Sequence, residues 1–366
     1  MAQPVSDFVV GQQLSGSEAP LAGQFDLIVL DLDGVVYIGP DAVPGAADAL
    51  DQAREIGMPL RFVTNNASRP PEVVAEHLTR LGVPATTEEV VTSAQVAAAL
   101  LARRFAPGDG VLVVGAAGLR DALAERGLVP MDSVDQGPVA VVQGFGPDVG
   151  WRLLAEATRA VRAGLFWMAT NLDPTVPTAF GAAPGNGALV QVVASAAGRG
   201  PDEVAGKPQP GAFLEAARQA GSSRPLVIGD RLDTDLEGAR AAGMHGLLVL
   251  TGVTGAVDLL TAPPHRRPHY VGRDLQALLT GQPVVQQLAA SVQVVDDAVR
   301  VSSAGDDALD LLRVAAVSVW THLDRSGAAE PDPAHPDPAH HGPARLDLDE
   351  LLGSLRSLEP GAAWAR

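Results

Sequence analysis

The chain has 366 residues, of which none is cysteine and only one is lysine. The lack of cysteine excludes disulfides and catalysis by a thiolate. Arginine supplies every other basic side chain among the 26 lysine and arginine residues, and the single lysine is Lys207. An ammonium group is a compact point charge, whereas a guanidinium is a wide planar fork. A lone lysine in such a chain indicates a tight site that needs a small cation, and a surface lysine without a role is the alternative.

Positive charge and long apolar runs are also scarce. The formal net charge is −17, which argues against a nucleic-acid partner because phosphates attract clustered basic residues. No segment approaches the ~20 apolar residues that cross a bilayer, and Met1–Gln24 lacks the features of a signal peptide. We therefore expect a cytoplasmic protein that binds no membrane. An anionic substrate would need a local positive site, which Lys207 and a divalent metal could supply.

Short apolar segments alternate with amphipathic segments along most of the chain. The expected strands of the main pattern are Phe25–Leu30, Leu60–Val63, Pro225–Ile228 and Gly246–Leu250. The expected helices are Pro44–Glu55, Pro71–Arg80, Gly211–Gln219 and Asp235–Ala242. Alternating strands and helices are typical of parallel sheets covered by helices. We predict an α/β fold with a doubly wound parallel sheet, in which ligands bind at the carboxyl ends of the strands.

The interval between Thr64 and Lys207 is much longer than one crossover connection needs. It contains a second α/β pattern, with strands expected at Val111–Val114, Val139–Gln143 and Leu165–Ala169, and helices at Leu119–Arg126, Trp151–Arg162 and Gly187–Ala197. We predict an inserted α/β cap domain at 85–200, which divides the catalytic core into 25–84 and 201–282. A lid of this kind can exclude water and select the substrate.

The two ends of the chain differ from this pattern. Residues 1–24 are expected to be an N-terminal tail, and 283–366 a C-terminal extension. Within the extension we expect one or two strands at Val292–Val301 and helices at Asp306–Leu323 and Arg345–Leu358. A tandem PDPAH repeat lies in a predicted flexible linker at 328–343, since such a composition cannot form a core.

Two aspartates follow the first expected strand in Asp31-Leu32-Asp33-Gly34. Gly34 permits a turn that lets both carboxyl groups face the crevice. A carboxylate can attack phosphorus to form an aspartyl-phosphate, and a second carboxyl group can protonate the leaving alkoxide and later activate water. This motif, placed directly after an apolar strand, predicts phosphoryl chemistry.

Polar residues that could bind a metal ion and a phosphate group follow two further expected strands. Asp230, at the end of an apolar strand in the segment GDRLDTD, can bind Mg²⁺ together with substrate phosphate and water. The acids Asp233 and Asp235 also suit a helix N-terminus, which is their alternative interpretation. In Thr64-Asn65-Asn66, a hydroxyl and neighbouring backbone N–H groups can hold a phosphate, although an Asn-rich turn is the alternative. Lys207 and Mg²⁺ would offset the repulsion between phosphate and the aspartates.

The ordered motifs DxDG, TNN, GKP and GDxxxTD resemble the haloacid dehalogenase (HAD) superfamily of phosphatases. The segments DGVVY, FVTNNAS, VVTS, ATNLD, GKPQP and GDRLDTD are similar to its NagD-like, p-nitrophenylphosphatase branch, which carries a type-2 cap. The similarity extends to bacterial glycerol-3-phosphate phosphatases. It covers about residues 24–280, and it is specific for reaction type rather than for substrate.

This resemblance implies a role for each acidic residue of the core. Asp31 would be the nucleophile, Asp33 the general acid and base, and Lys207 a partner of Asp31 and of the phosphate. The ligands of magnesium would be the side chains of Asp31 and Asp230 and the backbone carbonyl of Asp33. Asp235 would orient this metal shell or Lys207. The second aspartate, Asp33, favours a phosphatase over a dehalogenase.

The resemblance also implies the residues that bind substrate. Thr64, Asn65 and Asn66 would hold the phosphate together with Lys207. Asn171 and Asp173 of the cap are candidates for binding substrate hydroxyls, with an Asx turn as the alternative. The expected partner is a small phosphorylated metabolite, with glycerol 3-phosphate as first choice. Phosphoglycolate, pyridoxal phosphate or a nucleoside monophosphate are the alternatives.

Other functions are weighed against this hydrolase. A metabolite-binding or interaction protein could retain the fold, but it would not need a nucleophile. A phosphotransferase would share the aspartyl-phosphate and is not distinguished by the sequence. The extension resembles in part a fragment of an acetyltransferase fold, but it has no glycine-rich acyl-CoA loop, so we predict no second activity. A docking role, or a role in a possible homodimer, is expected of it.

Overall fold

A computed structural model describes residues 14–178, 181–326 and 346–365. The predicted linker at 328–343 lies outside the described residues, as does the first part of the predicted tail. The chain forms two compact units. One takes its residues from Met1–Asp26, Val43–Met58 and Arg224–Arg366, and the other from Leu27–Ala42 and Pro59–Ser223. We call them the first and the second unit.

The second unit contains two groups of parallel strands. In the first group, β1 (Leu27–Leu30), β4 (Leu60–Thr64) and β5 (Val90–Thr92) pair in that order. All of β1 is buried, as expected for a parallel strand that is covered on both faces. The helices of this part are α2 (Pro71–Arg80), α3 (Ser93–Arg104) and α7 (Gly211–Ala220), and the short strands β2 (Tyr37–Ile38) and β3 (Asp41–Ala42) form a hairpin.

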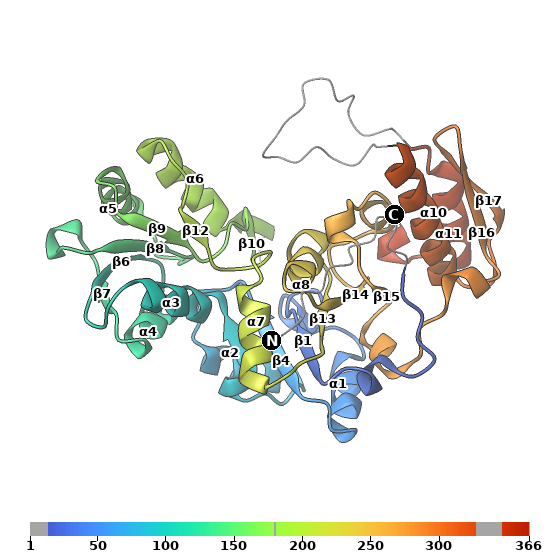
Figure 1. Cartoon of the computed structure of the whole chain (residues 1–366), viewed down its shortest axis with the longest axis horizontal. Helices are drawn as coiled ribbons and strands as arrows, with labels where there is room; N and C mark the ends of the chain where they lie inside the picture. The colour runs from blue at the N-terminus through green and yellow to red at the C-terminus, as the bar shows by residue number, and fades with distance from the viewer. Residues whose placement is uncertain (1–13, 179–180, 327–345, 366) are drawn as a thin grey trace, which may run out of the picture. The chain divides into compact units, whose positions relative to one another are not determined.

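The other parallel sheet of the second unit has the order β12-β9-β8-β6-β7. Its strands are β6 (Gly110–Val114), β7 (Val129–Met131), β8 (Ala140–Gln143), β9 (Phe166–Ala169) and β12 (Glu203–Val204). The helices are α4 (Ala117–Glu125), α5 (Trp151–Arg162) and α6 (Asn186–Ala197), and β10 (Thr175–Thr178) pairs antiparallel with β11 (Gly181–Pro184). Figure 1 shows α5 and α6 together on one face of the sheet, where they cover a core that includes Trp167 and Val190.

The first unit contains a third group of parallel strands, in the order β13-β14-β15. These strands are β13 (Pro225–Gly229), β14 (His245–Val249) and β15 (Tyr270–Gly272). The helices of this part are α1 (Ala46–Glu55), α8 (Glu237–Ala241) and α9 (Ala256–Leu260). Shorter 3-10 turns in the two units lie at Leu21–Gly23, Thr87–Glu89, Val134–Gln136, Pro264–Arg266, Leu275–Leu279, Val285–Gln287 and Ala363–Ala365.

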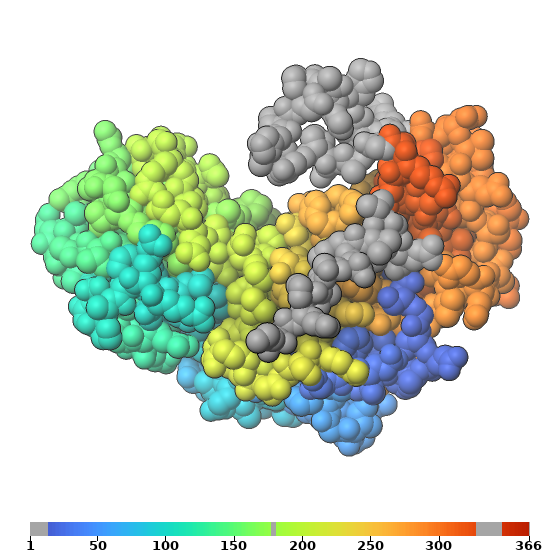
Figure 2. All heavy atoms as spheres, in the orientation of Figure 1, coloured from blue at the N-terminus to red at the C-terminus, as the bar shows by residue number. Residues whose placement is uncertain are grey.

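The C-terminal extension belongs to the first unit. It consists of the antiparallel strands β16 (Ser291–Val295) and β17 (Ala298–Ser303) and the helices α10 (Ala308–Ser326) and α11 (Asp349–Leu358). Figure 2 shows its orange and red atoms packed into one block. Its buried apolar side chains share one core cluster with those of β14 and α9.

The predicted α/β fold with parallel sheets and covering helices is confirmed, and the expected strands and helices agree closely with the observed elements. One difference is local. We expected a helix from Asp235, but Leu232–Leu236 forms a π-helical turn and α8 begins only at Glu237. The Arg231 carbonyl accepts from the backbone N–H groups of both Asp235 and Leu236, which widens this turn. Among the helices of the described ranges, none has the length and apolar character of a membrane span.

Candidate active site

Asp31 and Asp33 directly follow β1, where Gly34 turns the chain. Gly34 has a φ of 82°, in the left-handed region that glycine adopts without strain. Its N–H donates to the Tyr37 carbonyl at 2.7 Å, which closes the turn. The turn leaves Asp31 buried at the strand end and Asp33 accessible to solvent. The sequence placed both residues at this strand end, and the structure agrees.

Asp31 and Lys207 form a buried ion pair. The Lys207 Nζ donates to Asp31 Oδ1 at 2.6 Å, and the lysine side chain is only 4% exposed. Burial raises the pKa of Asp31 above its ordinary value, and the positive charge of Lys207 opposes this shift. A buried charge is stable when it is paired and hydrogen-bonded, so the Lys207 ammonium favours the carboxylate form of Asp31 against the effect of burial.

Asp33 also has a raised pKa. Desolvation by the surrounding protein atoms is the main cause, while Lys207 and Arg69 act in the opposite direction and the charge of Asp173 adds to the rise. The Asp33 carboxyl group therefore keeps its proton to a higher pH than an ordinary aspartate does. A carboxyl group of this kind is suited to donate a proton to a leaving group. Arg69 was not identified from the sequence.

Thr64 ends β4 and begins a tight turn. The buried Thr64 Oγ1 accepts from the Asn66 N–H at 3.1 Å. Asn66 Oδ1 in turn accepts from the N–H and the hydroxyl of Ser68, both at 2.8 Å. The Asn-rich turn weighed as an alternative is therefore present, and the backbone N–H groups of Asn66 and Ser68 donate to side-chain oxygens within it.

Asn65 connects the segment after β4 to Lys207. Its Oδ1 accepts from the Lys207 N–H at 2.8 Å, and its Nδ2 donates to the Lys207 carbonyl at 3.2 Å. Gly206 makes this approach possible, because a Cβ there would lie 2.6 Å from Asn65 Oδ1 and 2.4 Å from the Thr170 carbonyl. Nothing in the local sequence around Asn65 predicts this contact.

Asn171 and Asp173 also bind Asn65. Asn171 Nδ2 donates to the Asn65 carbonyl at 2.7 Å, and Asn65 Nδ2 donates to Asp173 Oδ2 at 3.0 Å. The Asp173 N–H donates to Asn171 Oδ1 at 3.1 Å, so the predicted alternative of an Asx turn is also present. Asn186, at the start of α6, donates to the Asn171 carbonyl at 2.7 Å and was missed by the sequence analysis.

Asp230 and Asp235 lie after β13 in the first unit. Asp230 is 1% exposed, and its Oδ2 accepts from the Val253 N–H at 2.7 Å. A Cβ at Gly252 would lie 1.9 Å from the same oxygen, so only glycine permits this loop to approach the carboxylate. The fully buried Asp235 accepts from the Arg231 N–H at 3.2 Å. Asp233 instead forms an ion pair with Arg231 at the surface.

Three of the predicted site residues carry the oxygen ligands that a hard divalent cation prefers. Asp31, Asp230 and Asp235 each present carboxylate oxygen, and all three are buried. Carboxylate oxygens are the usual protein ligands of Mg²⁺, which also retains water and substrate phosphate in its shell. A buried carboxylate held by backbone N–H groups, like Asp230, has the fixed orientation that a metal ligand needs.

Comparison with known proteins identifies the family. A family model described as haloacid dehalogenase-like hydrolase matches residues 28–129, and a HAD-hydrolase-like model matches residues 204–278. The D-glycerol 3-phosphate phosphatase of Mycobacterium tuberculosis is 45% identical over 311 residues, covering 82% of this chain and 87% of that protein. An acid sugar phosphatase of Staphylococcus aureus is 37% identical over 238 residues, covering 64% of this chain and 90% of that protein.

Solved structures give the same result. A glycerol phosphate phosphatase of M. tuberculosis in complex with calcium has a TM-score of 0.82 at 42% identity, covering 95% of this chain and 99% of the other. The same enzyme in complex with magnesium has a TM-score of 0.78 at 46% identity, covering 83% and 92%. A p-nitrophenyl phosphatase from Archaeoglobus fulgidus has a TM-score of 0.64 at 28% identity, covering 70% and 98%. With these similarities added to the pairing of Asp31 with Lys207, the chain belongs to the haloacid dehalogenase-like hydrolases and is one of their phosphatases.

Proposed function

We propose that the protein hydrolyses glycerol 3-phosphate in a Mg²⁺-dependent reaction that passes through an aspartyl-phosphate on Asp31. The observation that carries this proposal is the buried ion pair between Asp31 and Lys207, in which the only lysine of the chain meets the expected nucleophile. The choice of substrate rests on the 45% identity to a protein named for that activity.

In the first half of the reaction, Asp31 attacks the phosphorus atom and the alkoxide leaves. Lys207 keeps the Asp31 carboxylate ionised and oriented, and its charge offsets the negative charge of the phosphate. Asp33, whose raised pKa favours the protonated form, gives its proton to the leaving oxygen. The P–O bond to the alcohol breaks as the bond to Asp31 forms, so the free alcohol departs.

In the second half, Asp33 has become a carboxylate and acts as a base. It takes a proton from a water molecule, which attacks the phosphorus atom and releases phosphate from Asp31. We propose that the Thr64 hydroxyl and the Asn66 side-chain amide donate to the phosphate oxygens in both halves, together with neighbouring backbone N–H groups. The Asn65 side chain already binds the backbone of Lys207 and would act by positioning it.

Magnesium would be held by the side chains of Asp31 and Asp230 and by the backbone carbonyl of Asp33. When bound, it supplies positive charge that neutralises the phosphate oxygens. Asp235 would support this shell, since it accepts from the backbone N–H of the residue that follows Asp230. The buried carboxylates and the close approach of Gly252 support this assignment.

The domain roles expected from the sequence form part of the proposal. Residues 25–84 and 201–282 would be the catalytic core and 85–200 the cap. The parallel sheet β12-β9-β8-β6-β7 supports a separate α/β layer in this part of the chain. Asn171 and Asp173 were expected to bind substrate hydroxyls. Their hydrogen bonds to Asn65 support a positioning role instead.

The test is phosphate release from glycerol 3-phosphate, phosphoglycolate, pyridoxal phosphate, a nucleoside monophosphate and p-nitrophenyl phosphate, each with Mg²⁺ and with EDTA. We expect metal-dependent release with a preference for glycerol 3-phosphate, and no turnover by Asp31→Asn with an unchanged melting temperature. A preference for another ester would change the substrate alone. Release by Asp31→Asn at the wild-type rate would contradict the mechanism, and transfer to glycerol or another alcohol would indicate a phosphotransferase.

We also propose, from the sequence, a cytoplasmic location and a homodimer. Light scattering of the purified full chain measures the oligomeric state directly. A monomer across the micromolar range would contradict the dimer without affecting the proposed reaction.

A further inference from the structure

The C-terminal extension is anchored beside the segment that holds Asp230. We call Leu250–Gly255, which connects β14 to α9, the Asp230 loop. Within it, the Val253 N–H donates to Asp230 Oδ2 at 2.7 Å and the Thr254 N–H donates to the Asp230 carbonyl at 3.2 Å. The orientation of this carboxylate therefore depends on the position of the loop.

One anchor lies at the end of the Asp230 loop, on α9. The buried Trp320 of α10 donates its Nε1–H to the Leu259 carbonyl at 2.9 Å. Arg267 lies over the Trp320 ring at 5.2 Å, donates to the Ala262 carbonyl at 3.0 Å, and pairs with Asp324 of α10 at 2.7 and 2.8 Å. Arg267 is 3% exposed, so this bidentate pair is strongly held. These contacts fix the short helix that follows the loop.

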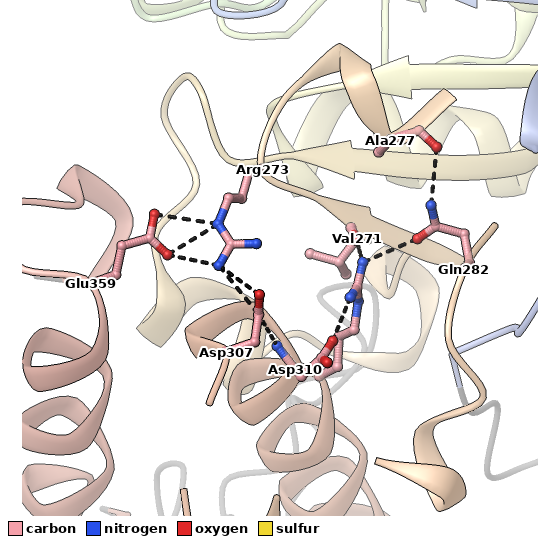
Figure 3. Close-up of polar contacts among 8 residues, drawn as sticks. Val271, Arg273, Ala277, Gln282, Asp307, Asp310 and Glu359 are labelled. Carbon is pink, nitrogen blue, oxygen red and sulfur yellow. Dashed lines mark hydrogen bonds and ion pairs between the residues drawn. The ribbon is translucent and has the colours of Figure 1, made fainter. Parts of the chain in front are cut away.

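A second anchor lies at the start of the loop, on Arg273. The Leu250 N–H is shared between the carbonyls of Gly272 and Arg273, both at 3.1 Å. Figure 3 shows the Arg273 guanidinium between Glu359 and Asp307 of the extension. Its Nη2 donates to Glu359 Oε2 at 2.9 Å and to Asp307 at 3.2 Å. The extension therefore holds Arg273, whose carbonyl accepts a hydrogen bond from the first residue of the Asp230 loop.

The same region has a further tie to the extension at β15. The largely buried Arg313 of α10 donates to the Val271 carbonyl at 2.6 Å and to Gln282 Oε1 at 3.1 Å. Gln282 donates to the Ala277 carbonyl at 3.0 Å (Figure 3). These bonds run beside the Arg273 anchor without touching the loop. They connect α10 to the middle residue of β15 and to the segment after it.

We propose that the C-terminal extension is a positioning element for metal binding: by fixing both ends of the Asp230 loop, it holds the Asp230 carboxylate in the orientation that Mg²⁺ requires. This inference rests on the proposed function for the assignment of Asp230 as a metal ligand. Partners that orient a metal ligand commonly change metal affinity by about 10–100-fold when they are removed. The extension would thus act on the metal without touching the substrate.

The test measures Mg²⁺ affinity without substrate, from the rise of the melting temperature of the full chain with Mg²⁺ concentration. Trp320→Phe keeps the apolar ring and removes the donor to Leu259. The double variant Asp307→Asn, Glu359→Gln weakens the hold on Arg273. We expect the apparent Mg²⁺ dissociation constant to rise about tenfold in each, with kcat at saturating Mg²⁺ near that of the wild type. If Trp320→Phe does not fold, the double variant decides the question.

Two controls separate positioning from general destabilisation. Leu351→Ala shortens a buried apolar side chain of α11 that takes no part in the hydrogen bonds or ion pairs of the two anchors. Glu350→Gln removes one negative charge from α11 at an exposed position, where Glu350 pairs with Arg300 and not with Arg273. We expect both to bind Mg²⁺ as the wild type does, even where their melting temperature falls. Wild-type Mg²⁺ affinity in the test variants, or an equal loss in the controls, would overturn the inference.

The result is independent of the substrate assignment. If the wild type binds Mg²⁺ and releases no phosphate from any ester, the proposed function fails while the comparison of affinities remains valid. If the wild type hydrolyses esters and all variants bind Mg²⁺ equally, the function stands and the positioning role is refuted.

Discussion

The side chain of Asn65 pairs with both backbone polar groups of Lys207, accepting from its N–H at 2.8 Å and donating to its carbonyl at 3.2 Å. The two residues are 142 positions apart in the chain. An amide side chain that pairs in this way imitates a neighbouring strand, and it fixes the backbone from which the Lys207 ammonium reaches Asp31. The position of the ammonium group that pairs with Asp31 thus depends on a residue of another motif.

Asn65→Ala should reduce kcat/KM by about 10–100-fold, because a misplaced cation loses much of its effect on the transition state. It should also lower the free energy of unfolding by about 1–3 kcal/mol, since partly buried backbone groups of Lys207 lose their partners. Steady-state kinetics and urea denaturation measure the two effects. Val190→Ala, which removes buried methyl groups in α6, is the control for lost stability and should keep its activity. Equal activity in Asn65→Ala and wild type would contradict the positioning role.

Lys207→Arg retains the charge and changes its shape. The lysine is 4% exposed and its Nζ lies 2.6 Å from Asp31, so a planar guanidinium has no room without displacing the carboxylate. We expect kcat to fall by at least about 100-fold, the usual loss when one stabilising group is removed from the transition state. Lys207→Met, which removes the charge at a similar volume, should be as impaired. Near-normal rates for Lys207→Arg would show that charge alone suffices at this position.

Asn171→Ala separates the two roles considered for the segment after β9. A residue that holds Asn65 should affect every substrate, whereas one that binds a hydroxyl should matter only for substrates that carry one. Because Asn171 donates to the Asn65 carbonyl at 2.7 Å, we expect kcat to fall about tenfold with both glycerol 3-phosphate and p-nitrophenyl phosphate. A raised KM for glycerol 3-phosphate alone would instead establish a direct contact with the substrate.

The sequence predicted those parts of the site that follow from local pattern. Asp31, Thr64 and Asp230 each end an apolar strand, and the carboxyl ends of parallel strands are where ligands bind. Strand periodicity therefore located all three. It could not locate the contact of Asn65 with Lys207, because an amide that bonds to a distant backbone leaves no periodic signal. The same holds for the approach of Gly252 to Asp230, since glycines also occur in ordinary turns.

The C-terminal extension shows a second limit of prediction from the sequence. Its strands and helices were expected from periodicity, but its packing on α9 depends on single long-range contacts, such as that of Trp320 with Leu259. The apolar face of a helix predicts that it is buried, and it does not predict against what. The sequence motifs that carry the resemblance to the phosphatase family end before this segment. Neither those motifs nor the periodicity therefore indicated which residues the extension contacts.

His269 should make the stability of the fold sensitive to acid. Burial lowers its pKa to about 3, and the stacked His245 and the charge of Arg240 add to this effect. A histidine with a lowered folded pKa stays neutral in the fold while the unfolded chain takes up a proton. Stability is therefore lost as the pH falls from the ordinary value of 6.5 toward 3. Relative to His269→Asn, the wild type should lose at most about 2 kcal/mol more between pH 7 and pH 5. Parallel stability curves for the two proteins would exclude this account.

Asp173→Asn should change the pH dependence of the reaction. The negative charge of Asp173 helps to raise the pKa of Asp33, so the neutral amide should lower that pKa. The acid step needs protonated Asp33, and the basic limb of the kcat/KM profile should therefore move to lower pH. The shape of the side chain and its acceptor oxygen for Asn65 are retained, which keeps the effect largely electrostatic.

The matched control is Asp148→Asn, which removes the same charge from an exposed position in the same unit. Its profile should superimpose on that of the wild type, because Asp148 does not contribute to the shift of Asp33. A basic limb that stays in place in Asp173→Asn would mean that a group other than Asp33 supplies the proton. A limb that moves to higher pH would reverse the sign of the interaction, and Asp33 could then not be the acid held protonated by its neighbours.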